Sequence, residues 1–102
     1  MKREIEELLA NIDAHHERVW QIQRSVERME ITGYAGNGDV TVKLRGTGEL
    51  SHVDIDERLL RAGDAEAVGY LVVEAVNDGL RRLGEASRRT FEPLIAEAEA
   101  TF

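Results

Sequence analysis

Arginines recur at helical spacings in two stretches of this chain. Guanidinium groups that share one face of a helix could bind phosphates. In the later stretch, two pairs of arginines are each separated by seven residues, so that four arginines lie along the exposed side of one predicted helix. In the earlier stretch, two arginines four residues apart share a helix face with Gln21. We call these six residues the arginine set: Arg24, Arg28, Arg81, Arg82, Arg88 and Arg89.

The acidic balance of the chain favours a different interpretation of the arginine set. With 13 Lys and Arg against 20 Asp and Glu, the formal net charge is −7, whereas proteins that bind a phosphate backbone usually present a basic surface. Asp78 and Glu85 precede Arg82 and Arg89 by four residues, the spacing of helical ion pairs. The set could therefore be a solvated, salt-bridged helix surface.

A metal site is the next chemistry to consider. His52, Asp54 and Asp56 alternate along a predicted strand and would share one face, where they could contribute to a divalent-cation site. A second element would have to complete that site, and a water-facing strand shows the same alternation. His15 has no second ligand at a suitable spacing, so that a core histidine is favoured over a metal-binding or catalytic one. We expect no metal.

Catalysis and cofactor binding find no support in the sequence. The absence of cysteine excludes a thiol nucleophile, a disulfide and a cysteine-ligated metal. The motifs Gly36-x-Gly38 and Gly46-x-Gly48 join strand to strand, whereas a phosphate-binding glycine loop leads from a strand into a helix. We expect neither an enzyme nor a cofactor. Because the first residues lack the apolar segment of a signal peptide and no run reaches transmembrane length, we expect a cytoplasmic protein.

Residues 31–56 are predicted to form three antiparallel strands. The run 40–45 alternates apolar and polar residues, which is the period-2 pattern of a half-buried strand. Val53 and Ile55 alternate with polar residues in the same way in the run 50–56. The sheet should therefore have one apolar face, which another element must cover, and one polar face.

Glycines separate the strands. Asn37-Gly38 favours a type I′ turn before the second strand, because Asn tolerates positive φ and Gly adopts it freely. Gly46 and Gly48 are expected to supply the same freedom before the third strand.

Two long helices are predicted to flank the sheet, over residues 2–30 and 64–90. In the first, residues that are apolar except for His15 recur at spacings of three and four, the pattern of a heptad seam: Ile5, Leu8, Ile12, His15, Val19, Ile22, Val26 and Met29. Asp64 is a suitable N-cap for the second. Ala75 and Gly79, four residues apart in it, would permit close approach of another backbone.

Pro93 is expected to interrupt the second helix, because it lacks an amide hydrogen and disfavours helix at the residue before it. Residues 93–102 are therefore assigned to a C-terminal tail, either a kinked continuation or a short packing helix. Its apolar residues recur at helical spacing: Leu94, Ile95, Ala98 and Phe102.

The lengths of these elements predict a homodimer. A helix over residues 2–30 would be about 40 Å long, whereas a six-residue strand spans about 20 Å, so that the sheet can cover only half of the apolar seam. The second helix, a partner subunit or both must cover the rest. Trp20 lies beside the seam, where it could pack or belong to a partner surface.

Several motifs in order resemble the YbaB/EbfC nucleoid-associated proteins over roughly residues 20–90. The motifs are Gly36-Asn37-Gly38, Val40-Thr41-Val42, Gly46-Thr47-Gly48, Ile55-Asp56 and Glu74-Ala75-Val76-Asn77-Asp78. The resemblance implies one α+β domain over residues 1–102, with the order α-β-β-β-α, a three-stranded antiparallel sheet between two long helices, and an intertwined homodimer.

The resemblance also implies a function. Members of this family are dimers whose helices grip duplex DNA with low sequence specificity, which would place this chain in the cytoplasm at the bacterial nucleoid. The arginine set would then contact phosphates instead of base edges, an assignment that rests on charge placement. The alternative is a dimeric protein-interaction module of the same fold without DNA affinity, with an unidentified protein partner.

Overall fold

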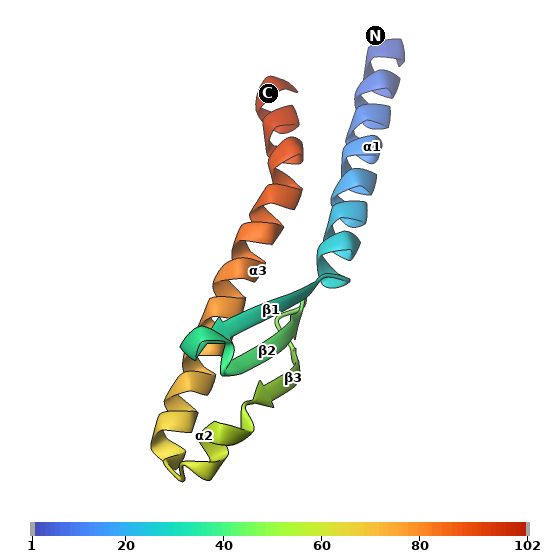
Figure 1. Ribbon diagram of the computed structural model, residues 1–102. Helices are drawn as coiled ribbons and strands as arrows, with labels where there is room; N and C mark the ends of the chain where they lie inside the picture. The colour runs from blue at the N-terminus through green and yellow to red at the C-terminus, as the bar shows by residue number, and fades with distance from the viewer. Residues whose placement is uncertain (1, 102) are drawn as a thin grey trace.

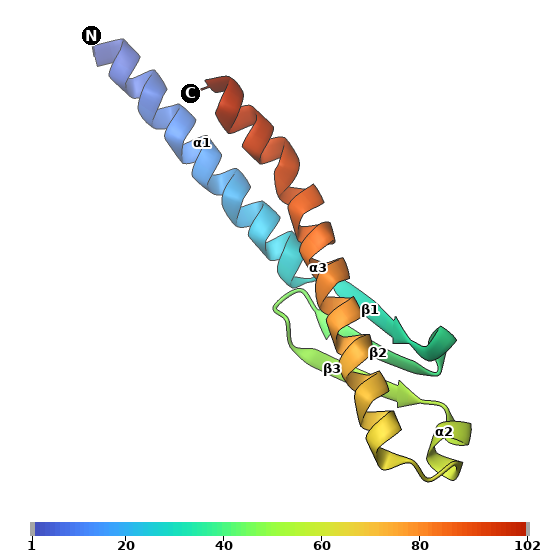
Figure 2. The same ribbon diagram turned by 90° about the vertical axis from the view of Figure 1, so that its left-hand side faces the viewer.

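The computed structural model describes residues 2–101, which form two long helices and a small sheet extending over 74 × 20 × 16 Å. Both long helices project from the same end of the sheet, and the two chain termini lie at their far ends (Figures 1 and 2). The elements confirm the predicted order α-β-β-β-α, with two short additions, η1 and α2. They are α1 (Lys2–Glu27), β1 (Glu30–Ala35), the 3₁₀ turn η1 (Gly36–Gly38), β2 (Val40–Arg45), β3 (Leu50–Ile55), α2 (Glu57–Arg61) and α3 (Ala65–Thr101).

The three strands form an antiparallel sheet in the order β1-β2-β3. Gly33 of β1 pairs with Val42 of β2, which in turn pairs with Val53 of β3. The apolar side of β2 lies in the core, because Val42 is 0% exposed and Leu44 is 1% exposed. The alternation in the run 40–45 therefore correctly predicted which face of this strand is buried.

Helix α3 packs mainly on β1 and β2 and leaves part of the apolar face of β3 open. Val53 pairs with the fully buried Val42 but is itself 41% exposed. Leu50 at the start of β3 is 46% exposed. The expectation that another element covers the whole apolar face thus holds for β1 and β2 but not for β3 within one chain.

Small residues allow α3 to cross β1 at close range. A Cβ atom built on Gly33 would lie 2.2 Å from the Ala75 carbonyl oxygen and 2.5 Å from the Gly79 nitrogen. Both distances are far inside van der Waals contact. The sequence prediction that Ala75 and Gly79 permit close approach of a backbone is confirmed, and that backbone is β1.

The first turn differs from the predicted type I′ turn. Ala35 pairs with Val40, so the connection contains four residues instead of two. Three of these residues adopt positive φ, at 58° for Gly36, 57° for Asn37 and 91° for Gly38. The expected type I′ turn was wrong because Gly36 and Asp39 also lie between the paired residues, and Gly36 takes the left-handed conformation as well.

Gly46 serves close packing instead of turn geometry. Positive φ occurs at Gly48, with 87°, and Gly46 is not among the glycines with positive φ. A Cβ atom on Gly46 would lie 1.5 Å from the Val26 carbonyl oxygen, and its own N–H donates to the Met29 carbonyl at 2.9 Å. This contact joins the second turn to the end of α1.

The boundaries of both long helices differ from those predicted. Helix α1 ends at Glu27 instead of residue 30, because β1 already begins at Glu30. Helix α3 runs from Ala65 to Thr101 through Pro93, so that no separate tail follows residue 90. Of the residues expected in that tail, Phe102 lies outside the described part of the chain.

Tertiary contacts explain why α3 continues beyond Pro93. The proline removes one backbone hydrogen bond and disfavours helix locally. Leu94, however, is only 8% exposed, and Glu97 forms an ion pair with Arg18 of α1. These contacts hold the end of α3 beside α1 (Figure 2).

The apolar seam of α1 is covered only near the sheet. Val26 is buried, and Val19 and Ile22 are partly buried. Ile5 and Leu8, at the free end, are 58% and 55% exposed. The prediction that the sheet covers only part of the seam is confirmed, and α3 does not cover its free end.

Candidate nucleic-acid interface

The arginine set lies in two places on the molecule. Arg24 is in the last turn of α1, and Arg28 follows in the turn before β1, where its N–H donates to the Arg24 carbonyl at 3.1 Å. The other four are on α3: Arg81, Arg82, Arg88 and Arg89. The structure therefore keeps the two groups predicted from the sequence, on separate helices.

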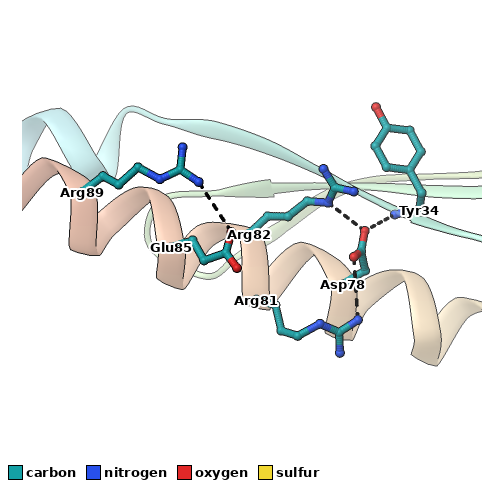
Figure 3. A network of polar contacts seen from close by, with 6 residues as sticks. All are labelled: Tyr34, Asp78, Arg81, Arg82, Glu85 and Arg89. Atoms are coloured by element: carbon teal, nitrogen blue, oxygen red, sulfur yellow. Dashed lines mark hydrogen bonds and ion pairs between the residues drawn. The ribbon is translucent and has the colours of Figure 1, made fainter.

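A carboxylate on α3 joins two of these arginines to the sheet. Asp78 Oδ2 accepts hydrogen bonds from the Tyr34 main-chain N–H and from Arg82 Nε, both at 2.9 Å (Figure 3). Its other oxygen, Oδ1, lies 3.7 Å from Arg81 Nη2. The Arg82 guanidinium carbon in turn lies 5.2 Å from the centre of the Tyr34 ring, a cation–π distance.

This environment stabilises the ionised form of Asp78. The hydrogen bond from the Tyr34 amide is the largest cause that lowers the pKa of Asp78, and the hydrogen bond and charge of Arg82 and the charge of Arg81 act in the same direction. Partial burial opposes them, since the carboxylate is only 23% exposed. Asp78 is therefore a fixed negative charge between two guanidinium groups.

The remaining arginines differ in how they are paired. Arg89 Nη2 lies 3.6 Å from Glu85 Oε2, and both side chains are more than half exposed, so that water weakens this pair. Within residues 2–101, Arg24, Arg28 and Arg88 have no carboxylate at ion-pair distance. The salt-bridge interpretation thus holds for Arg81, Arg82 and Arg89 but not for the other three members of the set.

An open groove lies beside the paired arginines. It has a volume of about 800 Å³ and runs between the η1 turn and the side of α3 that carries Asp78. The residues that line it include Tyr34, Asn77, Arg81 and Arg82, and also the acidic residues Glu74 and Asp78. Guanidinium and amide donors on one wall can bind anionic oxygen atoms.

Tyr34 is the residue of this site that the sequence did not indicate. Its backbone N–H donates to Asp78, 44 residues away in the sequence, and its ring lies beside the Arg82 guanidinium. No local periodicity reports such a contact. The signal available in the sequence was Gly33 beside it, a small residue where a helix can approach.

The alternating polar residues of β3 do not converge on a metal-binding geometry. His52 Nε2 pairs with Asp54 Oδ1 at 3.2 Å. Asp56 instead accepts from the Arg58 main-chain N–H at 2.8 Å and acts as the N-cap of α2. Among the described residues, no group of three His, Asp or Glu side chains is placed to hold a metal ion.

His15 and Trp20 lie along α1. His15 is partly buried, as expected for a histidine in the seam, whereas Trp20 is 61% exposed. No helix within the described range 2–101 combines the length and the apolar character needed to cross a membrane.

Comparison with known proteins places this fold among nucleoid-associated proteins. A nucleoid-associated protein of Phenylobacterium zucineum is 36% identical over 83 residues, which cover 81% of this chain and 78% of that protein. Another, from Koribacter versatilis, is 35% identical over 91 residues, covering 89% of this chain and 87% of that protein. The crystal structure of an uncharacterized protein from Helicobacter pylori matches with a TM-score of 0.71 at 27% identity, covering 86% of this chain and 92% of the other.

The family match spans almost the whole chain and includes both helices and the sheet. Residues 1–98 fit the family as one unit, in agreement with the resemblance seen in the glycine turns and in the segment that ends at Asp78. The chain belongs to the YbaB/EbfC DNA-binding family.

Proposed function

We propose that this chain binds duplex DNA with low sequence specificity as a homodimer. The observation that carries the proposal is the placement of exposed arginines on α3 and at the end of α1, in a member of a DNA-binding family. The side chains of Arg81 and Arg89 are 70% and 73% exposed. Guanidinium groups held in this way on a helix can reach the phosphates of a duplex.

Low specificity follows from the kind of contact proposed. Phosphates are the same at every base pair, so that contacts to them position a protein without reading sequence. Binding of this type would place the homodimer at the bacterial nucleoid, in the cytoplasm. The names of the relatives from Phenylobacterium zucineum and Koribacter versatilis support this location.

The homodimer is supported by apolar surface that one chain leaves open. On α3, Asp78 and Arg82 lie on the flank next to β1, so that Val73 and Leu80, on the opposite flank, lie toward the side of β3. Both are exposed, as is Val53 on β3 itself. Exposed apolar side chains on neighbouring elements are suited to an interface between protein chains.

The two edges of the sheet differ in how a second chain could use them. On β1, the Tyr34 N–H already donates to Asp78, so that this edge is partly closed. Leu50 and Val53 are exposed on β3. Pairing of a second copy near β3 would cover those residues and protect an open strand edge.

Electrophoretic mobility shift with two duplexes of equal length, one rich in A·T and one rich in G·C, tests the DNA-binding proposal. We expect similar affinities for both duplexes and a large loss of affinity in Arg81→Glu with Arg88→Glu. A shift that is unchanged in this double variant would contradict the use of α3. A dissociation constant that differs more than about a hundredfold between the duplexes would contradict phosphate-only contacts.

The second candidate is a dimeric protein-interaction module without DNA affinity. It is favoured by the net charge of −7 and by the carboxylates that already pair with Arg81, Arg82 and Arg89. A wild-type protein that is dimeric but produces no shift even at low salt would support this candidate and contradict DNA binding.

A further inference from the structure

Asp78 is in contact with three groups, one on β1 and two on its own helix, α3. One is the backbone of β1, through the Tyr34 N–H, and the other two are the guanidinium groups of Arg81 and Arg82. Figure 3 shows the carboxylate between them, with Arg82 extended toward the Tyr34 ring. The contact with β1 links α3 to the sheet. The contacts with the arginines neutralise part of the positive charge that would attract a phosphate.

We infer that Asp78 limits the affinity of this protein for DNA, because its carboxylate competes with DNA phosphates for Arg81 and Arg82. The inference rests on the proposed DNA binding and adds that a carboxylate of the protein itself competes with the DNA. A phosphate must displace the carboxylate from Arg82, or share the guanidinium with it, before a full ion pair forms. Arg88, which has no carboxylate partner among the described residues, is free of this competition.

The structural and the electrostatic role of Asp78 share one carboxylate, so that a change of charge and not of position is needed to separate them. Oδ2 alone accepts from both the Tyr34 N–H and Arg82 Nε, while Oδ1 faces Arg81. An asparagine at this position has one carbonyl oxygen that can accept from Tyr34, but it carries no charge. Asp78→Asn can therefore keep the link to β1, and it removes the negative charge that competes with phosphates for Arg81 and Arg82.

The competitor is present at every physiological pH. Its contacts lower the pKa of the Asp78 carboxyl, so mild acidification does not protonate it. Arg82 also lies over the Tyr34 ring. This contact would keep the guanidinium beside the groove after its release from Asp78.

Titration of a fluorescent random duplex, followed by anisotropy, tests the inference with Asp78→Asn and a matched control. We expect Asp78→Asn to bind about three- to tenfold more tightly than the wild type and with a steeper salt dependence, because additional phosphate contacts release additional counterions. Asp54→Asn removes the same charge from an exposed site on β3, away from the arginine set. An equal gain in both variants would show an effect of net charge alone and would overturn the inference.

A double-mutant cycle locates the effect. In an Arg81→Gln with Arg82→Gln background, Asp78→Asn should no longer raise affinity, because the groups that it competes for are absent. A gain that persists in this background overturns the inference.

A further comparison leaves Asp78 intact and covers the case in which Asp78→Asn does not fold. Arg82→Gln should weaken DNA binding less than Arg88→Gln, since the charge of Arg82 is already compensated. An equal or larger loss in Arg82→Gln overturns the competition. If the wild type binds no duplex at low salt, the proposed DNA binding itself fails; if the wild type binds and these comparisons show no difference, the role of Asp78 alone fails.

Discussion

Gly33 lies so close to Ala75 that a Cβ atom on the glycine would be 2.2 Å from the alanine carbonyl oxygen. This contact sets the distance between β1 and α3, and through it the position of every arginine on α3 relative to the sheet. The same crossing brings Gly79 beside Gly33, so that backbone meets backbone over one helical turn.

Gly33→Ala is expected to destabilise the fold by about 2–3 kcal/mol, because the added methyl group has backbone atoms on its far side and cannot be accommodated by a rotamer change. Urea unfolding followed by circular dichroism measures the change. Gly69→Ala is the matched control, since its Cβ would meet nothing within 4 Å. That control should be stabilised by up to about 1 kcal/mol through helix propensity. Equal stability of Gly33→Ala and the wild type would contradict the close crossing.

The sequence predicted the elements more reliably than their contacts. Alternation in β2 reports a face, and the structure buries that face. The same alternation in β3 did not predict that Val53 is 41% exposed. Alternation shows which residues share a face of the sheet, but not whether another element packs on that face. At Pro93, the local rule was wrong since the burial of Leu94 and the ion pair of Glu97 with Arg18 depend on a second helix.

In the candidate site, too, the residues of one helix were predicted but a contact between two elements was not. All four arginines on α3 and their neighbour Asp78 were recognisable from helical spacing. The bond from Tyr34 to Asp78 was not, because 44 residues separate them and no local pattern encodes the crossing of β1 by α3.

The Asp78 contacts predict a pH dependence of stability. The folded state lowers the pKa of Asp78, so its contribution is fully present above the ordinary carboxyl pKa of about 4 and is lost as the pH falls through the lower folded value. Wild type and Asp78→Asn should therefore differ most in unfolding free energy at neutral pH and converge as the pH falls below the ordinary carboxyl pKa. Urea unfolding at a series of pH values measures this difference. A constant difference across the series would show that the charge of Asp78 does not contribute.

Val53→Lys is expected to shift the proposed homodimer toward monomer, because it places a charge on the open apolar face of β3. Light scattering after gel filtration at micromolar concentration measures the molar mass. His52→Lys is the control, since the neighbouring side chain points to the opposite face of the same strand. A wild type that is monomeric and well folded under these conditions contradicts the homodimer, and a Val53→Lys variant with unchanged mass contradicts this interface.

Pro93→Ala is expected to stabilise the protein by about 1–3 kcal/mol, because alanine restores a helical N–H donor and removes the clash of the proline ring. The melting temperature by circular dichroism should rise with no loss of helix signal. A fall in melting temperature would show that the proline geometry is needed for α3 to lie beside α1.

Salt dependence of DNA binding tests the central claim that exposed arginines of this acidic protein contact phosphates. Anisotropy titrations of a random duplex between about 50 and 200 mM salt should give a linear plot of log affinity against log salt, with a slope steeper than about −3 for a dimer that uses several arginines. Arg81→Glu with Arg88→Glu should flatten that slope. Affinity that is independent of salt, or a slope that the double variant leaves unchanged, would contradict the claim.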